Sequence, residues 1–242
     1  MAELSALHLS KFYGKKHVVK NVTFTMHSGD VTGLLGPNGA GKTTSFYMIV
    51  GFIKANGGSV MIDGHDITSL PMHKRSKMGL AYLPQEPSIF RKLSVENNIR
   101  LVLETQKDLS KADREEMLEK LIDDFGIQKV RKQYGYTLSG GERRRTEIAR
   151  SLATSPKFLL LDEPFAGIDP KAVYEIKQII KRLAASGIGI LLTDHNVRDT
   201  LEITTTAHII SDGEILVSGT KEELLSNERA REIYFGRDFG KE

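Results

Sequence analysis

Residues 36–43 read Gly36-Pro37-Asn38-Gly39-Ala40-Gly41-Lys42-Thr43, followed by Thr44, and fit the spacing G-x-x-x-x-G-K-[ST] of a phosphate-binding loop. The stretch follows an apolar run at residues 31–35 and precedes a helical pattern, which is where this motif must lie. Its glycines let backbone N–H groups wrap phosphate oxygens, and Lys42 brings a positive charge to the β and γ phosphates. The hydroxyl of Thr43 is a candidate ligand for Mg²⁺. A glycine-rich turn that arose by chance would not be expected between an apolar strand and a helix. The stretch therefore predicts an α/β nucleotide-binding fold.

The hydrophobic pattern outside this loop indicates two kinds of strand. Residues 31–35, 158–161 and 188–193 are short, mostly apolar runs, each followed by a polar or glycine-rich turn, as is typical of buried parallel strands. Residues 22–26 and 59–63 instead alternate apolar with polar side chains, which predicts antiparallel strands in the N-terminal third. The chain should therefore form a doubly wound α/β core with an N-terminal antiparallel β subdomain.

Residues 94–134 read as helical, with Ser94 and Ser110 as N-caps, and lie between the phosphate loop and a second motif described below. We interpret them as a helical subdomain inserted into the α/β core. The expected organisation has four parts: 1–87, the β subdomain and phosphate-loop part of the core; 88–136, the helical subdomain; 137–220, the rest of the core; and 221–242, a C-terminal helix and tail. Within the last part, residues 221–234 should form one helix, and residues 236–242 a short polar tail.

Composition removes several classes of protein. The 242 residues are 40% hydrophobic, enough for a sizeable core, and their 34 basic and 31 acidic residues give no argument for a nucleic-acid partner. The absence of cysteine excludes a disulfide framework and a thiolate metal site. The N-terminus lacks the pattern of a secretory signal, and no apolar run approaches the roughly 20 residues that span a bilayer. We expect a cytoplasmic protein that meets a membrane only through a partner.

Two adjacent acids follow one of the predicted buried strands. Asp162 and Glu163 end the run Phe158-Leu159-Leu160-Leu161, at the carboxyl edge where open α/β sheets bind ligands. Asp162 suits a magnesium-holding role, and Glu163 can accept a proton from, or orient, an attacking water. An ordinary acidic turn before Pro164 is the alternative, and the phosphate loop upstream makes it the weaker interpretation.

The second motif is Leu138-Ser139-Gly140-Gly141-Glu142, which runs into a basic helix at residues 143–150. Ser139 and Glu142 have the spacing of a capping box, a pattern that opens many helices and exposes amides that favour an anion. Together with the phosphate loop, this motif resembles the signature sequence of the ATP-binding cassette (ABC) ATPases. The resemblance covers almost the whole chain and implies a phosphate-loop NTPase core of the RecA-like class with ATP and Mg²⁺ as ligands.

The resemblance also implies roles for side chains that the residues alone leave open. In ABC ATPases an aromatic residue at the position of Tyr13 stacks on adenine, although a structural tyrosine is also possible here. Gln85 matches a glutamine that senses magnesium and water, and His195 matches a histidine that contacts the γ phosphate, whereas a lone histidine is more often structural. Asp169 matches the acidic residue of a loop that crosses between subunits. The catalytic set is then Lys42, Glu163 and His195.

Because the chain holds one set of motifs, the resemblance implies a head-to-tail homodimer, or a pair with a second cassette. Each ATP would lie between the phosphate loop of one subunit and Ser139, Gly140 and Gly141 of the other. Closure needs the γ phosphate, because its charge is what the facing helix N-terminus binds.

Several stretches resemble the ATPase subunits of bacterial lipopolysaccharide exporters. They are residues 82–86, 88–95, 138–145, 162–167, 193–198 and 234–239. This resemblance implies a place on the cytoplasmic face of the inner membrane, with integral membrane subunits contacting residues 85–91 and with Ile89, Phe90 and Arg91 lining the groove. An apolar pair in a loop is equally often core. ATPases of branched-chain amino acid importers are the alternative, and a soluble, non-transport ABC ATPase is an alternative of another class.

Overall fold

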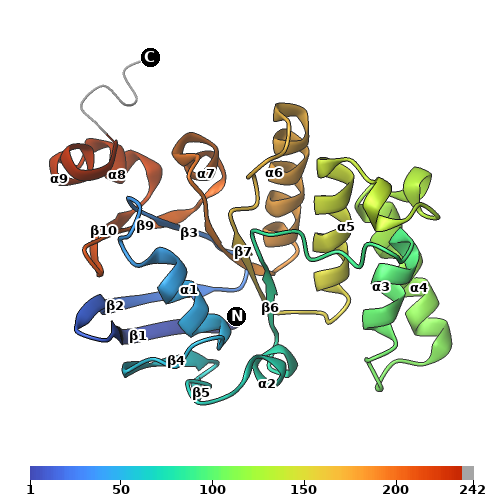
Figure 1. Cartoon of the computed structure of the whole chain (residues 1–242), viewed down its shortest axis with the longest axis horizontal. Coiled ribbons are helices and arrows are strands. Elements are labelled where there is room, and N and C mark those ends of the chain that lie inside the picture. Colours follow the sequence, from blue (N-terminus) through green and yellow to red (C-terminus); the bar gives the residue numbers. More distant parts are fainter. Residues whose placement is uncertain (236–242) are drawn as a thin grey trace.

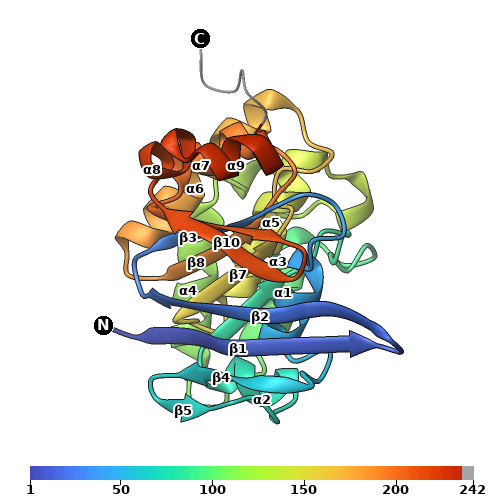
Figure 2. The same ribbon diagram turned by 90° about the vertical axis from the view of Figure 1, so that its left-hand side faces the viewer.

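The computed structural model describes residues 1–235, and within them ten strands form one continuous sheet (Figures 1 and 2). The strand order is β5-β4-β1-β2-β10-β9-β3-β8-β7-β6. The strands are β1 (Glu3–Tyr13), β2 (Lys16–His27), β3 (Val31–Leu35), β4 (Gly57–Ile62), β5 (His65–Asp66), β6 (Leu80–Leu83), β7 (Phe158–Asp162), β8 (Gly189–Thr193), β9 (Thr206–Ser211) and β10 (Glu214–Gly219).

The parallel half of the sheet confirms the three predicted buried strands. Every residue of β3, β7 and β8 is buried, and β8 lies between the other two with parallel pairing on both sides. Strand β6 extends this half beyond β7, so that β6, β7, β8 and β3 all end at the same edge. Side chains that follow these four strands are therefore brought together by the sheet itself.

The antiparallel half contains β1, β2, β4 and β5, as the alternating pattern predicts. It is not a separate sheet, however, because Glu214 of β10 pairs in parallel with Asn21 of β2 and joins the two halves. Strands β9 and β10, which the sequence interpretation did not identify, form the antiparallel hairpin that makes this junction. The β subdomain is thus continuous with the strand that carries the phosphate loop.

Helices α3, α4, α5 and α6 form a layer on one side of the molecule, in which α3 and α4 stand farthest from the β subdomain, whereas α1 lies beside β1 and β2 (Figure 1). Ser94, Ser110 and Ser139 cap α3, α4 and α5 through their side chains, as predicted. The helices are α1 (Lys42–Val50), α2 (Met72–Lys77), α3 (Val95–Leu103), α4 (Lys111–Asp124), α5 (Gly140–Leu152), α6 (Pro170–Ala185), α7 (Val197–Ile203), α8 (Lys221–Ser226) and α9 (Glu228–Ala230), with short turns η1 (Gln128–Val130), η2 (Gly135–Thr137) and η3 (Arg231–Phe235).

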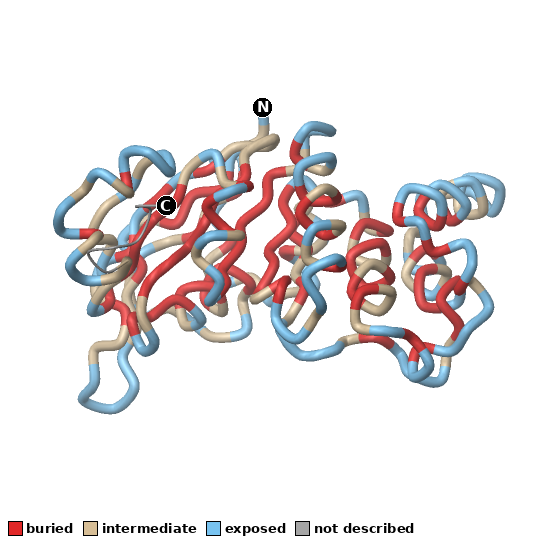
Figure 3. Tube along the Cα trace, turned by 90° about the horizontal axis from the view of Figure 1, so that it is seen from above, coloured by how far each residue is buried: buried red, intermediate tan, exposed pale blue. Residues whose placement is uncertain are grey.

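The hydrophobic core extends through the helical layer. One cluster of buried side chains runs from Leu118 of α4 through Ile148 of α5 to Leu161 of β7, so the inserted helices share the core of the sheet. Figure 3 shows the buried backbone concentrated along the strands and on the inner sides of the helices. None of the helices in residues 1–235 is long and apolar enough to cross a membrane.

The C-terminal segment differs from the single helix expected over residues 221–234. It is divided into α8, α9 and the π-helical turn η3, with the break at Asn227. Asn227 has an extended backbone with ψ of 116°, and its side chain accepts a hydrogen bond from the N–H of Ala230, so it starts a new helical turn. The predicted polar tail at residues 236–242 lies outside the described residues.

Candidate nucleotide site

The phosphate loop connects the buried strand β3 to the helix α1, and its glycines adopt backbone conformations that other residues avoid. The φ angles of Gly39 and Gly41 are 80° and 107°. At Gly36 a Cβ atom would lie 2.1 Å from the carbonyl oxygen of Ile210, so no other residue fits there. Helix α1 has no side-chain cap, which leaves its first N–H groups directed into the loop. This is a ready-made cradle for phosphate oxygens.

The ammonium group of Lys42 lies inside that loop. Its Nζ donates to the carbonyl oxygens of Gly36 at 2.6 Å and of Pro37 at 3.0 Å. Burial lowers the pKa of Lys42, and the negative charge of Glu163 opposes this shift. Lys42 and Glu163 belong to different sequence motifs. The fold brings these motifs close enough for the charge of Glu163 to act on Lys42.

Asp162 is the last residue of β7 and is almost fully buried, at 4% exposure. Burial raises its pKa, while a hydrogen bond from the hydroxyl of Tyr82 to its Oδ2 at 3.2 Å opposes that shift. Tyr82 is a residue that the sequence interpretation passed over. The sequence feature that could have identified Tyr82 is its position three residues before Gln85, in the segment Tyr82-Leu83-Pro84-Gln85 that begins on the strand next to β7.

Glu163 is held between two predicted site residues. Its carboxylate accepts a hydrogen bond from Nε2 of Gln85 at 2.6 Å and lies 2.7 Å from Nε2 of His195. The φ of Glu163 is 45°, an unusual left-handed conformation for a residue with a side chain, and its N–H donates to the carbonyl of Thr193 at 2.8 Å. The turn thus aims the carboxylate across the edge of the sheet, where Gln85, Glu163 and His195 meet.

Two further polar residues fix this edge, and neither was singled out in the sequence. The carboxylate of Asp194 accepts hydrogen bonds from the N–H groups of Phe165 at 3.1 Å and Asn196 at 2.8 Å, linking the turns after β7 and β8. The buried guanidinium of Arg144 donates to the carbonyls of Pro84 at 2.8 Å and Asp162 at 3.2 Å. Both contacts join segments far apart in sequence, which is why local patterns did not reveal them.

The Ser139 motif lies elsewhere in the chain. Ser139 caps α5, and its Oγ donates to Glu142 at 2.7 Å while accepting from the N–H of Glu142. Ser139 itself is exposed, and α5 is separated from α1 by β7 and β6 (Figure 1). Gly141 allows α5 to pack closely on α6, because a Cβ there would lie 2.8 Å from that of Ala172. Asp169 caps α6 beside this motif, its side chain accepting from the N–H of Ala172.

Tyr13 ends β1 and is 51% exposed, with the Lys11 ammonium 5.5 Å from the centre of its ring. Its free face suits stacking on a flat ring. Among the loop residues, Asn38, Gly39 and Thr43 are also exposed, whereas Ala40 is buried and Thr44 is partly buried. The predicted residues thus fall into two groups: the phosphate-loop and strand-end residues, with Tyr13, on the β side, and Ser139, Gly140 and Gly141 on the helical side.

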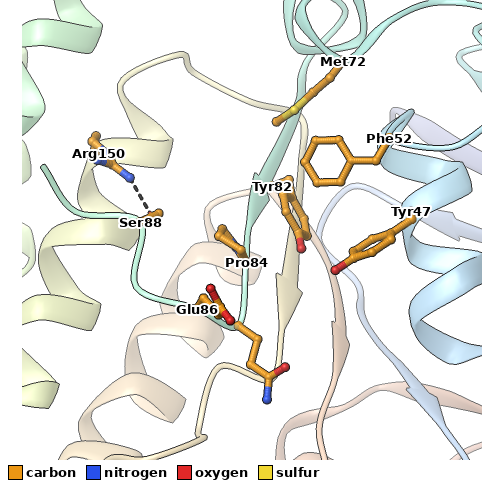
Figure 4. Close-up of a pocket in the computed structure, with 9 residues that line it drawn as sticks. Tyr47, Phe52, Met72, Tyr82, Pro84, Glu86, Ser88 and Arg150 are labelled. Carbon is orange, nitrogen blue, oxygen red and sulfur yellow. Dashed lines mark hydrogen bonds between the residues drawn. The ribbon is translucent and has the colours of Figure 1, made fainter.

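A surface cavity of about 480 Å³ opens next to this edge (Figure 4). Within residues 85–91, it is lined by Gln85, Glu86 and Ser88. None of Ile89, Phe90 and Arg91, which we expected to line the groove, belongs to the wall of this cavity. Ile89 is buried in the core at 6% exposure, and its N–H donates to Glu147. Phe90 is exposed, with the Arg150 guanidinium 5.0 Å above its ring. The full lining is Tyr47, Phe52, Met72, Tyr82, Pro84, Gln85, Glu86, Ser88 and Arg150.

Comparison with known proteins identifies the family. The model of the ABC transporter family matches residues 19–166. The chain is also 52% identical, over 99% of both lengths, to the lipopolysaccharide export system ATP-binding protein LptB of Escherichia coli K12. The chain belongs to the ABC transporter family. The corresponding LptB of Haemophilus influenzae is 51% identical, again over 99% of both chains.

Solved structures agree with the ABC fold. The ADP conformation of MJ1267, an ATP-binding cassette of an ABC transporter, has a TM-score of 0.86 at 29% identity and covers 98% of this chain and 99% of its own. The cbiO1 subunit of Clostridium perfringens, part of the transporter complex cbiONQ, has a TM-score of 0.85 at 25% identity, over 94% of this chain and 91% of its own. The mixed α/β cassette with its antiparallel N-terminal strands and helical subdomain is therefore confirmed, and membership of the family implies that the chain binds ATP.

Proposed function

We propose that this ABC protein is the ATP-hydrolysing subunit of a transporter that exports lipopolysaccharide from the bacterial inner membrane, working on its cytoplasmic face. The observation that carries the proposal is the identity of 52% with LptB along the full length of both chains. A likeness that covers both chains end to end includes the segments that meet partners as well as the nucleotide site.

The two groups of site residues support a head-to-tail dimer. The phosphate loop is open to solvent at Asn38, Gly39 and Thr43, while Ser139 offers an exposed helix start on α5, a different helix from the α1 that follows the phosphate loop. A second copy, turned by a twofold rotation, supplies each missing half. The γ phosphate favours closure, because the amides at the start of α5 bind its negative charge.

The residues fit magnesium. Asp162 offers a buried carboxylate and Thr43 a hydroxyl, both oxygen donors of the kind that Mg²⁺ prefers. In the described part of the chain no group of three or more His, Cys, Asp or Glu residues is arranged to hold a metal. Magnesium needs no such cage, because it is commonly held by one or two carboxylates together with the phosphates of the nucleotide. When bound, it offsets negative charge on the phosphates.

Hydrolysis then uses the geometry at the sheet edge. Lys42 exchanges its bonds to the carbonyls of Gly36 and Pro37 for phosphate oxygens, within the same loop. Glu163 orients the attacking water and accepts its proton, for which it has room beside Gln85 and His195, because a carboxylate offers about four acceptor sites. His195, whose side chain is 58% exposed, is free to turn from Glu163 toward the γ phosphate.

The cavity beside Gln85 is the proposed contact with the integral membrane subunits. Its lining comes from α1, α2, β6 and the loop after β6 on one side and from Arg150 of α5 on the other, and it borders the helical subdomain, which we place at residues 88–136, at Ser88. It combines aromatic side chains with the charged groups of Arg150 and Glu86. An apolar helix end carrying a polar group fits such a lining. Movement of this occupant reaches Glu163 through Gln85, because the two side chains share a hydrogen bond.

The experiment is purification of the chain from its native host, with identification of the membrane proteins that accompany it. Co-purification of two membrane subunits and lipopolysaccharide would support the proposal if the lipopolysaccharide leaves the membrane only when ATP is hydrolysed. The Glu163→Gln variant should retain the same partners without release. Recovery of a solute-binding importer instead would reject the export function while leaving the ATPase proposal intact.

A further inference from the structure

Tyr82 lies between the cavity and the magnesium carboxylate. In the parallel pair β6 and β7, Tyr82 is opposite Leu160, so Asp162, two residues farther on, has its side chain on the same face of the sheet. The hydroxyl of Tyr82 reaches across this short diagonal and donates to Oδ2 of Asp162 at 3.2 Å. The register of two strands therefore creates a contact that no local motif encodes.

The same side chain forms part of the cavity wall. Its ring packs edge to face on Phe52, with ring centres 5.2 Å apart and planes at 89°. Its hydroxyl also interacts with that of Tyr47, and all three aromatic side chains point toward one another (Figure 4). Tyr82 is only partly buried, so an occupant of the cavity can touch the ring while the hydroxyl remains bonded to Asp162.

We propose that Tyr82 is a positioning residue that couples the cavity to magnesium, holding Asp162 in the orientation for the metal until an occupant shifts the ring. The inference rests on the proposed function, which assigns magnesium to Asp162 and the membrane partner to the cavity. It provides a second connection from cavity to nucleotide, one that acts on the metal carboxylate, whereas Gln85 acts on Glu163. Partners of metal ligands commonly change metal affinity when removed.

The first test measures binding of a fluorescent, non-hydrolysable ATP analogue in Mg²⁺ and in EDTA. Tyr82→Phe should reduce the gain in affinity given by Mg²⁺ about tenfold, with binding in EDTA unchanged. Ser88→Ala is the matched control, because it removes a hydroxyl from the same cavity wall that bonds Arg150 and not Tyr82 or Asp162, and its Mg²⁺ gain should stay within about twofold of wild type. A wild-type Mg²⁺ gain in Tyr82→Phe would overturn the inference.

The variant Asp162→Asn distinguishes a failure of the role proposed for Tyr82 from a failure of the magnesium assignment on which that role rests. If Asp162→Asn loses the Mg²⁺ gain and Tyr82→Phe keeps it, only the role of Tyr82 fails. If Asp162→Asn itself keeps the Mg²⁺ gain, the magnesium assignment fails, and the role of Tyr82 fails with it. Melting temperatures of all three variants, measured without nucleotide, identify any loss caused by misfolding.

The second test places an occupant in the cavity. The chain has no cysteine, so Met72→Cys gives a single thiol in the cavity wall that a bulky maleimide can label. Labelling should reduce the Mg²⁺ gain at least threefold when Tyr82 is present and have no further effect in the Tyr82→Phe background, which makes the two changes non-additive. Equal effects of the label in both backgrounds would show that the cavity acts on the nucleotide without Tyr82.

Discussion

The two halves of the proposed site are built in opposite ways. On the phosphate-loop side, Asp162 and Lys42 are buried and Glu163 is held by two neighbours, so strand ends and long-range contacts fix each group. On the signature side, Ser139 is exposed, and its hydroxyl is hydrogen-bonded to Glu142 of its own capping box. The first half is prepared by its own subunit, whereas the second half is a surface, which is what a site shared between two subunits requires.

The largest effect on ATP hydrolysis should come from a substitution on the phosphate-loop side of the site. Glu163→Gln removes the proton acceptor while keeping the shape of the side chain, so turnover should fall by about 10²- to 10⁴-fold with ATP binding retained. Phosphate release and equilibrium nucleotide binding measure the two quantities separately. Glu86→Gln, an acid of the adjacent loop that lines the cavity, is the control and should keep isolated ATPase activity. Wild-type turnover in Glu163→Gln would remove this residue from the mechanism.

The signature half should respond next. Ser139→Ala should lower ATP hydrolysis roughly 10- to 100-fold, because a donor to the partner's nucleotide is lost, while binding to its own phosphate loop persists. Ser110→Ala is a matched control, since Ser110 caps α4 with the same kind of capping box. Both variants should lose about 1 kcal/mol of stability from the missing cap. Equal ATPase activities in the two would show that Ser139 is only a cap.

A smaller effect is expected at the edge of the phosphate-loop half. Tyr13→Ala should weaken ATP binding about two- to tenfold through loss of stacking, and should weaken GTP binding similarly because stacking recognises little beyond a flat ring. Phe12→Ala is the control, since Phe12 is also exposed but stacks on His17 with ring centres 3.8 Å apart. Titration with fluorescent nucleotides gives both affinities. Unchanged ATP binding in Tyr13→Ala would place the base elsewhere.

The smallest effect on activity should come from replacing His208. This change tests the stability of the sheet that carries the phosphate loop, and it does not test the reaction. His208 lies opposite Leu34 of the phosphate-loop strand, and burial lowers its pKa from 6.5 to about 4. The unfolded chain therefore takes up a proton at a higher pH than the folded chain does. Stability is full above pH 6.5 and falls as the pH drops toward 4, by about 3 kcal/mol from this residue.

Chemical denaturation between pH 7.5 and 4.5 measures this loss. His208→Gln should show a shallower decrease than wild type, which separates His208 from the carboxylates that also titrate in acid. ATPase activity at pH 7.5 should be similar in both proteins. Parallel stability curves would mean that His208 is not the buried group responsible.

The sequence predicted what depends on short-range patterns. The strands β3, β7 and β8 follow from short, mostly apolar runs, and the caps at Ser94, Ser110 and Ser139 follow from a hydroxyl placed before a helical pattern. The order of the strand-end motifs also predicted which side chains lie at one edge, because parallel strands end together. Gln85 and His195 needed the family resemblance, since neither has a distinctive local pattern.

What the sequence did not predict depends on contacts across the sheet. The hydrogen bond from Tyr82 to Asp162 follows from the register of β6 and β7, and the bonds of Arg144 follow from how α5 crosses the strand ends. The junction between β10 and β2 likewise joins residues nearly two hundred positions apart, Asn21 and Glu214. The expected single C-terminal helix was wrong because Asn227 ends one turn and caps the next.

A mixture of two inactive variants tests the division of the site most directly. Glu163→Gln and Ser139→Ala are each defective at both sites of their own homodimers, but a mixed dimer has one site with both Glu163 and Ser139 intact. Random exchange of subunits should therefore restore about a quarter of wild-type ATPase activity, from half of the dimers with one working site each. If Ser139 instead served the nucleotide of its own subunit, no mixed dimer would hold an intact site, and the activity would not rise above that of the separate variants.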